Sequence, residues 1–258
     1  MQTAPTGLLL SPHDLDVASL GERTFPSPLG LSTVPGDWIA DYVPDGIRIA
    51  LEVEMASGKP PTREHMFEKA GPRARIFFDP KETRAGIVTC GGLCPGINNV
   101  IRSLVFELHH KYGVKGVLGF RYGFHGLDPK GGGLPPIELT PEAVAHVHRQ
   151  GGSMLGLSRG KRDVATMADT LAELEIDILF AVGGDGTLRG AHAIAEEVAR
   201  RGARIPVIAI PKTIDNDIEY VEETFGYETA VEVARLAVDA AHTEALGAYN
   251  GVGIVKLM

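Results

Sequence analysis

Residues 176–210 read IDILFAVGGDGTLRGAHAIAEEVARRGARIPVIAI, and the alternation of apolar and amphipathic runs in this stretch decides the fold class. The apolar run 176–182 predicts a buried strand, residues 188–201 a helix, and residues 204–210 the next strand. A right-handed crossover makes the two strands parallel, so the loops that follow them lie at the same carboxyl edge of a sheet. Open α/β sheets bind their ligands at that edge.

The chain before this unit continues the same pattern. We expect the further elements to be strands at 85–90 and 114–120 and helices at 99–113, 141–150 and about 163–174. Residues 81–258 are therefore predicted to form an α/β domain, an open and mainly parallel sheet with helices on both faces. Residues 1–80 carry scattered Pro/Gly clusters with weak periodicity and are expected to be an irregular N-terminal extension.

Composition narrows the class of protein. The chain has 258 residues, of which 44% are hydrophobic and 22% charged, as in ordinary globular proteins. No run approaches the roughly 20 apolar residues of a membrane span, and the first residues lack a secretory signal, so a cytoplasmic location is expected. The net charge of −8 offers no basic face to nucleic acid or to a membrane. A polyanionic substrate would need a local cluster of cations.

The loop Gly91–Gly96, GGLCPG, leads directly into the predicted helix at Ile97. Free backbone N–H groups and the positive end of the helix dipole would point at a ligand there, and phosphate suits such a site. Glycines are also common where a tight turn needs positive φ, so this loop alone leaves both interpretations open.

The loop Gly183–Thr187, GGDGT, is a stronger indication of phosphate. Its glycines let the backbone approach a polyphosphate, and Asp185 could hold Mg²⁺ directly or through water. The alternative is that Asp185 merely caps the following helix.

The loop Pro211–Asp217, PKTIDND, adds two carboxylates and a lysine just beyond a strand. Phosphoryl transfer to a hydroxyl needs a base for the departing proton and positive charge around the transferred group, which Asp215 and Lys212 could provide with Mg²⁺. An Asx-rich turn is the alternative. A fourth stretch, GGSMLGLSRGKR at 151–162, concentrates Arg159, Lys161 and Arg162 and is either the required cation cluster or a solvated basic turn.

Together these stretches resemble the 6-phosphofructokinase family over about residues 70–258. The segments that match are GGLCPGIN, GSMLGLSR, GGDGT and PKTIDND, in the family's order. NAD kinases and diacylglycerol kinases share GGDGT but lack the TIDND partner. The resemblance implies transfer of the γ-phosphate of ATP to the 1-hydroxyl of fructose 6-phosphate, with Mg²⁺ as cofactor.

The resemblance also implies roles for matching positions. Asp185 would serve Mg²⁺ as well as ATP, Asp215 would be the base, Asp217 would help to hold the metal and the loop, and Lys212 would stabilise the transferring phosphoryl group. The residues expected to contact ATP are Gly92, Arg159, Gly184, Asp185, Gly186 and Thr187. Those expected at the sugar phosphate are Thr213, Ile214 and Asp215.

Two positions bear on the phosphoryl donor. Pyrophosphate-using relatives resemble GGDD with PKTIDND, whereas simple bacterial ATP enzymes resemble GGDG with PGTIDND; this chain combines Gly186 with Lys212. A carboxylate at 186 would crowd and repel the α-phosphate of ATP, so we expect the ATP-dependent plant and trypanosome branch. One alternative is a pyrophosphate-dependent enzyme, which Gly186 disfavours and Lys212 leaves open. The other is a non-catalytic nucleotide-binding regulatory subunit, against which the intact Asp185, Asp215 and Asp217 argue.

The chain ends at GIVKLM, residues 253–258, in a strand-like pattern. Family members continue into a second, sugar-phosphate domain, so we expect a truncated sequence that is inactive or nearly so by itself. The resemblance further implies a homo-oligomer, a dimer or tetramer, in the full-length protein.

Overall fold

The computed structural model describes residues 15–51 and 66–257. The chain divides into two compact units, Met1–Asp79 and Pro80–Met258. Residues 1–14 and 52–65 of the predicted extension lie outside the described residues. Met258, the last residue of the expected terminal strand, lies outside them as well.

The first unit has little regular structure among its described residues. Two short antiparallel pairs form there, joining β1 to β4 and β2 to β3. Asp45 forms ion pairs with Arg23 at 2.9 Å and with Arg73 at 3.2 Å. These pairs link parts of the unit that are distant in the sequence. The strands are β1 (Phe25–Pro26), β2 (Arg48–Ala50), β3 (Met66–Glu68) and β4 (Arg75–Ile76).

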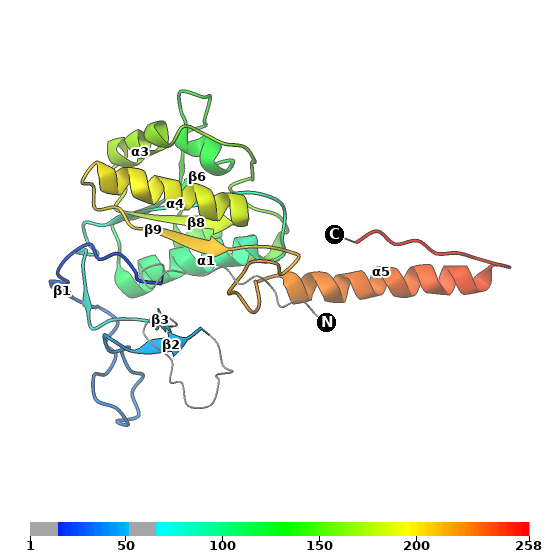
Figure 1. The fold of residues 1–258 in the computed structure, drawn as a ribbon, viewed down its shortest axis with the longest axis horizontal. Coiled ribbons are helices and arrows are strands. Elements are labelled where there is room, and N and C mark those ends of the chain that lie inside the picture. Colours follow the sequence, from blue (N-terminus) through cyan, green and yellow to red (C-terminus); the bar gives the residue numbers. More distant parts are fainter. Residues whose placement is uncertain (1–14, 52–65, 258) are drawn as a thin grey trace, which may run out of the picture. The chain divides into compact units, whose positions relative to one another are not determined.

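The second unit is built on a five-stranded sheet in the order β7-β6-β5-β8-β9 (Figure 1). Four strands are parallel, and β7 pairs antiparallel with β6 at one edge. The open, mainly parallel sheet predicted from the sequence is confirmed. The strands are β5 (Arg84–Thr89), β6 (Gly116–Phe120), β7 (Ile137–Glu138), β8 (Ile178–Gly183) and β9 (Val207–Pro211).

Two of the helices begin at a residue whose side chain caps them. The Asp163 carboxylate accepts a hydrogen bond from Thr166 N at 2.9 Å, and Thr140 Oγ1 accepts one from Ala143 N at 3.2 Å. The α-helices are α1 (Ile97–Phe106), α2 (Pro141–Val144), α3 (Val164–Glu173), α4 (Asp185–Arg200) and α5 (Tyr227–Gly247). A π-helical segment η2 (Glu107–Tyr112) extends α1, and 3₁₀ turns form η3 (Gly123–Leu127) and η4 (Val147–Arg149).

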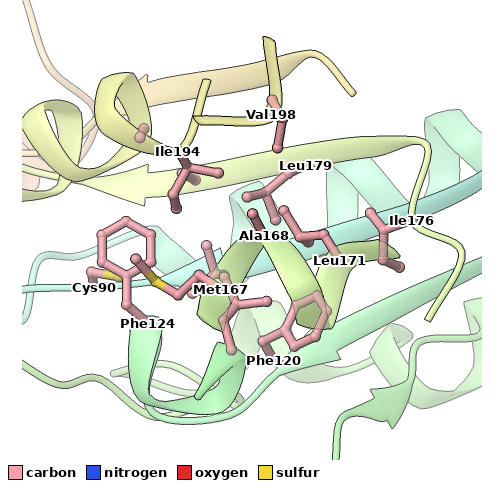
Figure 2. Close-up of a cluster of buried hydrophobic side chains, with 14 residues drawn as sticks. Cys90, Phe120, Phe124, Met167, Ala168, Leu171, Ile176, Leu179, Ile194 and Val198 are labelled. Carbon is pink, nitrogen blue, oxygen red and sulfur yellow. The ribbon is translucent and has the colours of Figure 1, made fainter. Parts of the chain in front are cut away.

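Helices cover both faces of the sheet, as expected, with α3 and α4 on one face and α1 on the other (Figure 1). Figure 2 shows the cluster on the α3/α4 face, where Leu171 of α3 and Ile194 of α4 lie close to Leu179 of β8. The opposite cluster buries Ile87 of β5 against Ile101 of α1. Successive side chains of β5 thus enter different clusters, because strand residues alternate between the two faces.

Two expectations need correction, and one helix was missed. The helix expected at 141–150 ends at Val144 and gives way to η4, a tighter turn that lets Val144 and Val147 both enter the core. The strand expected at the chain end is absent from described residues 251–257, which have no neighbouring strand to pair with. Helix α5 was not predicted; none of its residues is buried, although its Ala/Glu/Leu-rich sequence favours a helix.

Candidate functional site

The three predicted loops follow β5, β8 and β9, which are adjacent parallel strands. Their backbones are joined where the strands end: Cys90 N donates to Val182 O at 2.9 Å, and Lys212 N donates to Gly183 O at 3.0 Å. The structure therefore brings GGLCPG, GGDGT and PKTIDND together at the carboxyl edge of the sheet, as the sequence predicted.

The basic turn at 151–162 is attached to the same edge. Gly91 N donates to Ser158 O at 3.0 Å, and Thr89 Oγ1 lies 2.8 Å from Ser153 Oγ and donates to Gly156 O at 2.9 Å. These bonds hold the cation cluster beside the first glycine loop.

A buried asparagine gives the basic turn a second anchor. Asn98, in the first turn of α1, donates through Nδ2 to Gln150 O at 3.0 Å and accepts from Met154 N at 2.8 Å through Oδ1. The residue is 2% exposed. The sequence interpretation assigned it no role, although a polar residue among the apolar positions of an amphipathic helix is a signal that could have been used.

A cleft of about 740 Å³ opens between these loops. Of the residues expected to contact ATP, all six line it: Gly92, Arg159, Gly184, Asp185, Gly186 and Thr187. Its charged lining residues are Arg159, Lys161, Arg162, Arg189, Lys212 and the single carboxylate Asp185. An acidic protein thus presents a locally positive concave surface of the kind a polyphosphate requires.

Two glycines of GGDGT have different surroundings. A Cβ on Gly183 would lie 2.1 Å from Thr187 Oγ1, so the fold itself needs glycine there. A Cβ on Gly186 would meet nothing within 4 Å. Packing therefore requires glycine at 183 but not at 186, where the space beside the backbone is open.

Asp185 is the candidate magnesium ligand. Its side chain is 68% exposed and only loosely paired with Arg189, at 3.6 Å. No group of three or more His, Cys, Asp or Glu side chains within residues 15–51 and 66–257 could hold a metal ion by itself. One accessible carboxylate in a cationic cleft fits Mg²⁺ that arrives with phosphate and water ligands.

Lys212 connects two loops. It is 4% exposed, and its Nζ donates to Gly92 O at 2.8 Å, linking PKTIDND to GGLCPG. Burial lowers the pKa of this amine, and the charge of Arg159 acts in the same direction. The amine lies at the wall of the cleft, where its hydrogen bond to Gly92 O links two of the loops that form the cleft.

The carboxylates of PKTIDND lie outside the lining of this cleft. Thr213 Oγ1 donates to Asp217 Oδ1 at 2.6 Å and accepts from Asp215 N at 3.1 Å. Asp215 and Asp217 are exposed, so both can meet a ligand. Ile214 packs its side chain against the core, so any contact it made with a sugar phosphate would come from its backbone.

An open parallel sheet with glycine-rich loops, cations and an accessible aspartate at its carboxyl edge defines a phosphate-binding α/β domain. Residues 84–258 match the family PFK: Phosphofructokinase. The chain belongs to the phosphofructokinase family. None of its described helices is long and apolar enough to span a membrane.

Several relatives are similar in sequence to this chain. The chain is 56% identical over 191 residues to ATP-dependent 6-phosphofructokinase of Trypanosoma cruzi, covering 74% of this chain and 39% of the relative. It is 52% identical over 192 residues to the Entamoeba histolytica enzyme of the same name, covering 74% and 43%. The Borreliella burgdorferi enzyme is 43% identical over 246 residues, covering 95% and 55%. The chain therefore spans about half, or less, of the length of these relatives.

Solved structures share the fold. The Pichia pastoris phosphofructokinase aligns with a TM-score of 0.56 at 26% identity, covering 72% of this chain and 20% of that one. A pyrophosphate-dependent phosphofructokinase from Marinobacter aquaeolei aligns with a TM-score of 0.56 at 22% identity, covering 62% and 41%. Similarity at the latter identity concerns the fold alone.

Proposed function

We propose that the protein to which this chain belongs is an ATP-dependent 6-phosphofructokinase, which transfers the γ-phosphate of ATP to the 1-hydroxyl of fructose 6-phosphate. The observation that carries the proposal is the open space at Gly186 beside the accessible Asp185, inside a cleft lined by five cations. A nucleotide phosphate chain would occupy that space. The three relatives described above are named as ATP-dependent enzymes.

The proposed chemistry uses two neighbouring loops. Asp215 takes the proton of the 1-hydroxyl while that oxygen forms a bond to the γ-phosphorus, and the bond from phosphorus to the β–γ bridging oxygen breaks to release ADP. Arg159 and Lys212 would stabilise negative charge on the phosphoryl oxygens. Asp217, bonded to Thr213, would hold the loop in shape.

Asp185 would hold the magnesium of the nucleotide, with Asp217 assisting. When bound, Mg²⁺ neutralises charge on the phosphate oxygens. Because the chain provides so few carboxylates for it, we expect metal binding to depend on the nucleotide.

Pyrophosphate as donor is the second candidate, because pyrophosphate-using relatives resemble PKTIDND, the motif in which this chain carries Lys212. Gly186 favours ATP instead, since a pyrophosphate site gains nothing from space for an α-phosphate. We also infer a cytoplasmic location, from the sequence features described above, and a homo-oligomeric state for the full-length protein, as the resemblance implies.

A coupled assay for fructose 1,6-bisphosphate tests the proposal. It is run on this chain and on a version extended through the downstream reading frame, first with ATP and then with pyrophosphate. The proposal expects turnover with ATP in the extended protein and little or none in this chain. Turnover with pyrophosphate alone would select the second candidate, and no turnover with either donor would overturn the kinase assignment.

A further inference from the structure

The loop that carries Asp215 is closed by side chains to which the function so far gives no role. We propose that Asn216 and Thr224 are positioning residues that hold Asp215 in place for proton transfer. This inference rests on the proposed function, because it assumes that Asp215 is the base.

Asn216 lies next to Asp215 and has an unusual backbone. Its φ is +52°, in the left-handed region that asparagine tolerates better than most residues. Its side chain bonds across the loop in both directions: Oδ1 accepts from Thr224 N at 2.8 Å, and Nδ2 donates to Glu222 O at 2.9 Å. Asparagine thus supplies both the local conformation and the cross-loop bonds.

Thr224 closes the loop at its base. It is 2% exposed, and its Oγ1 donates to Thr213 O at 2.7 Å, across eleven positions of sequence. Thr213 Oγ1 in turn accepts a hydrogen bond from Asp215 N. The Thr224 hydroxyl therefore holds a residue that is itself bonded to the backbone of Asp215. Removing the Thr224 hydroxyl would leave its buried acceptor without a hydrogen bond and would destabilise the loop. The bond therefore helps to keep the loop in one conformation.

The closed loop is attached to the first glycine loop. Cys94 Sγ donates to Phe225 O at 3.2 Å, directly after Thr224. Burial raises the pKa of the Cys94 thiol; the charge of Lys212 opposes this shift, and the charge of Asp215 adds a smaller increase. The hydrogen bond from Cys94 therefore joins the loop that carries Asp215 to GGLCPG.

Asp215 is exposed, so the backbone of its loop determines the position from which its side chain extends. Neither Asn216 nor Thr224 lines the cleft proposed for ATP. Loosening the loop should therefore displace the base while leaving nucleotide binding intact, and a displacement of about 1 Å can lower a rate by about 100-fold.

The test compares Thr224→Val, which keeps the shape and removes the hydroxyl, with Thr224→Ser, which keeps the hydroxyl. Both are made in the extended protein, and kcat and KM are measured with ATP. We expect Thr224→Val to lower kcat by about 10- to 100-fold with KM for ATP within about twofold of wild type, and Thr224→Ser to restore most of kcat. Unchanged kcat in Thr224→Val, or equal losses in both variants, would overturn the inference.

Asn216→Gly provides a second route if Thr224→Val does not fold, because glycine keeps the positive φ and removes only the cross-loop bonds. The same kcat loss is expected, and its absence would count against the positioning role. Hydrogen exchange of residues 213–224 gives a readout that does not depend on activity: faster exchange in Thr224→Val but not in Thr224→Ser is expected. A wild-type protein inactive with either donor would overturn the proposed function instead, while the exchange data still decide whether Thr224 holds the loop.

Discussion

Gly183 and Gly186 stand three residues apart, yet the structure gives them different reasons to be glycine. At Gly183 an added methyl group meets the Thr187 side chain, whereas at Gly186 it meets open space. The first glycine is needed by the packing of the loop, and the second is available for a ligand.

Alanine substitutions should separate these roles. We expect Gly183→Ala to lower the free energy of unfolding by about 1–3 kcal/mol through overpacking, and Gly186→Ala to raise it by about 0.5–1 kcal/mol because residue 186 is helical. Urea denaturation of this chain measures both. Equal stabilities for the two variants would contradict the assignment.

Cys90 makes stability depend on pH at the alkaline end. Burial raises the pKa of its thiol from 9.0 to about 11, so the folded chain keeps a proton that the unfolded chain loses. The stabilisation of the folded chain by the protonated thiol is fully present below pH 9 and is lost as the pH rises from 9.0 to about 11. Over that range the free energy of unfolding should fall by about 2–3 kcal/mol.

Urea denaturation at pH 8 and pH 10.5 measures this loss of stability. In Cys90→Ala the difference in the free energy of unfolding between the two pH values should be smaller. Alkylation by iodoacetamide at pH 8, followed by mass spectrometry, adds a direct check. The native chain should leave Cys90 unmodified while the denatured chain is labelled. Rapid labelling of native Cys90 would show that its thiol is accessible and its pKa ordinary.

At the scale of elements, Lys212 joins the loops after β5 and β9 through one hydrogen bond to Gly92 O. Lys212→Met keeps the length of the side chain and removes the donor. We expect faster hydrogen exchange across residues 91–96, with the sheet unchanged. Lys161→Met, which removes an exposed cation from the same cleft, is the control and should leave that exchange unaltered. Equal behaviour of the two variants would remove the linking role of Lys212.

Strong local signals allowed most of the second unit to be predicted from the sequence. The strand at 178–183 was legible as an apolar run, and the helices after Thr140 and Asp163 begin where those residues cap them. Strand β7 was missed because two residues carry no periodicity, and α2 is shorter than expected because tertiary burial of Val147 outweighed the helical pattern.

The candidate site was legible in a similar way. Glycines, carboxylates and cations marked the loops, and parallel topology placed them on one edge. The bonds that hold them together were not predictable, since Asn98 and Thr224 act on residues 52 and 11 positions away. Such pairs are defined by the folded chain and not by local sequence.

At the scale of the molecule, the cleft proposed for ATP is formed entirely within the unit Pro80–Met258. The relatives compared here extend well beyond the matched region, since it makes up 39–55% of their length. The residues proposed to bind ATP therefore all lie in the region that this chain shares with those relatives.

If the GGDGT loop receives ATP at Gly186, as we propose, a carboxylate at that position should weaken the use of ATP. The quantity to measure is kcat/KM for ATP in the extended protein carrying Gly186→Asp, with Gly186→Ala as the matched control. A carboxylate there would crowd and repel the α-phosphate, so we expect Gly186→Asp to lower kcat/KM for ATP by about 100-fold and Gly186→Ala to lower it much less. Unchanged ATP kinetics in Gly186→Asp would contradict the account.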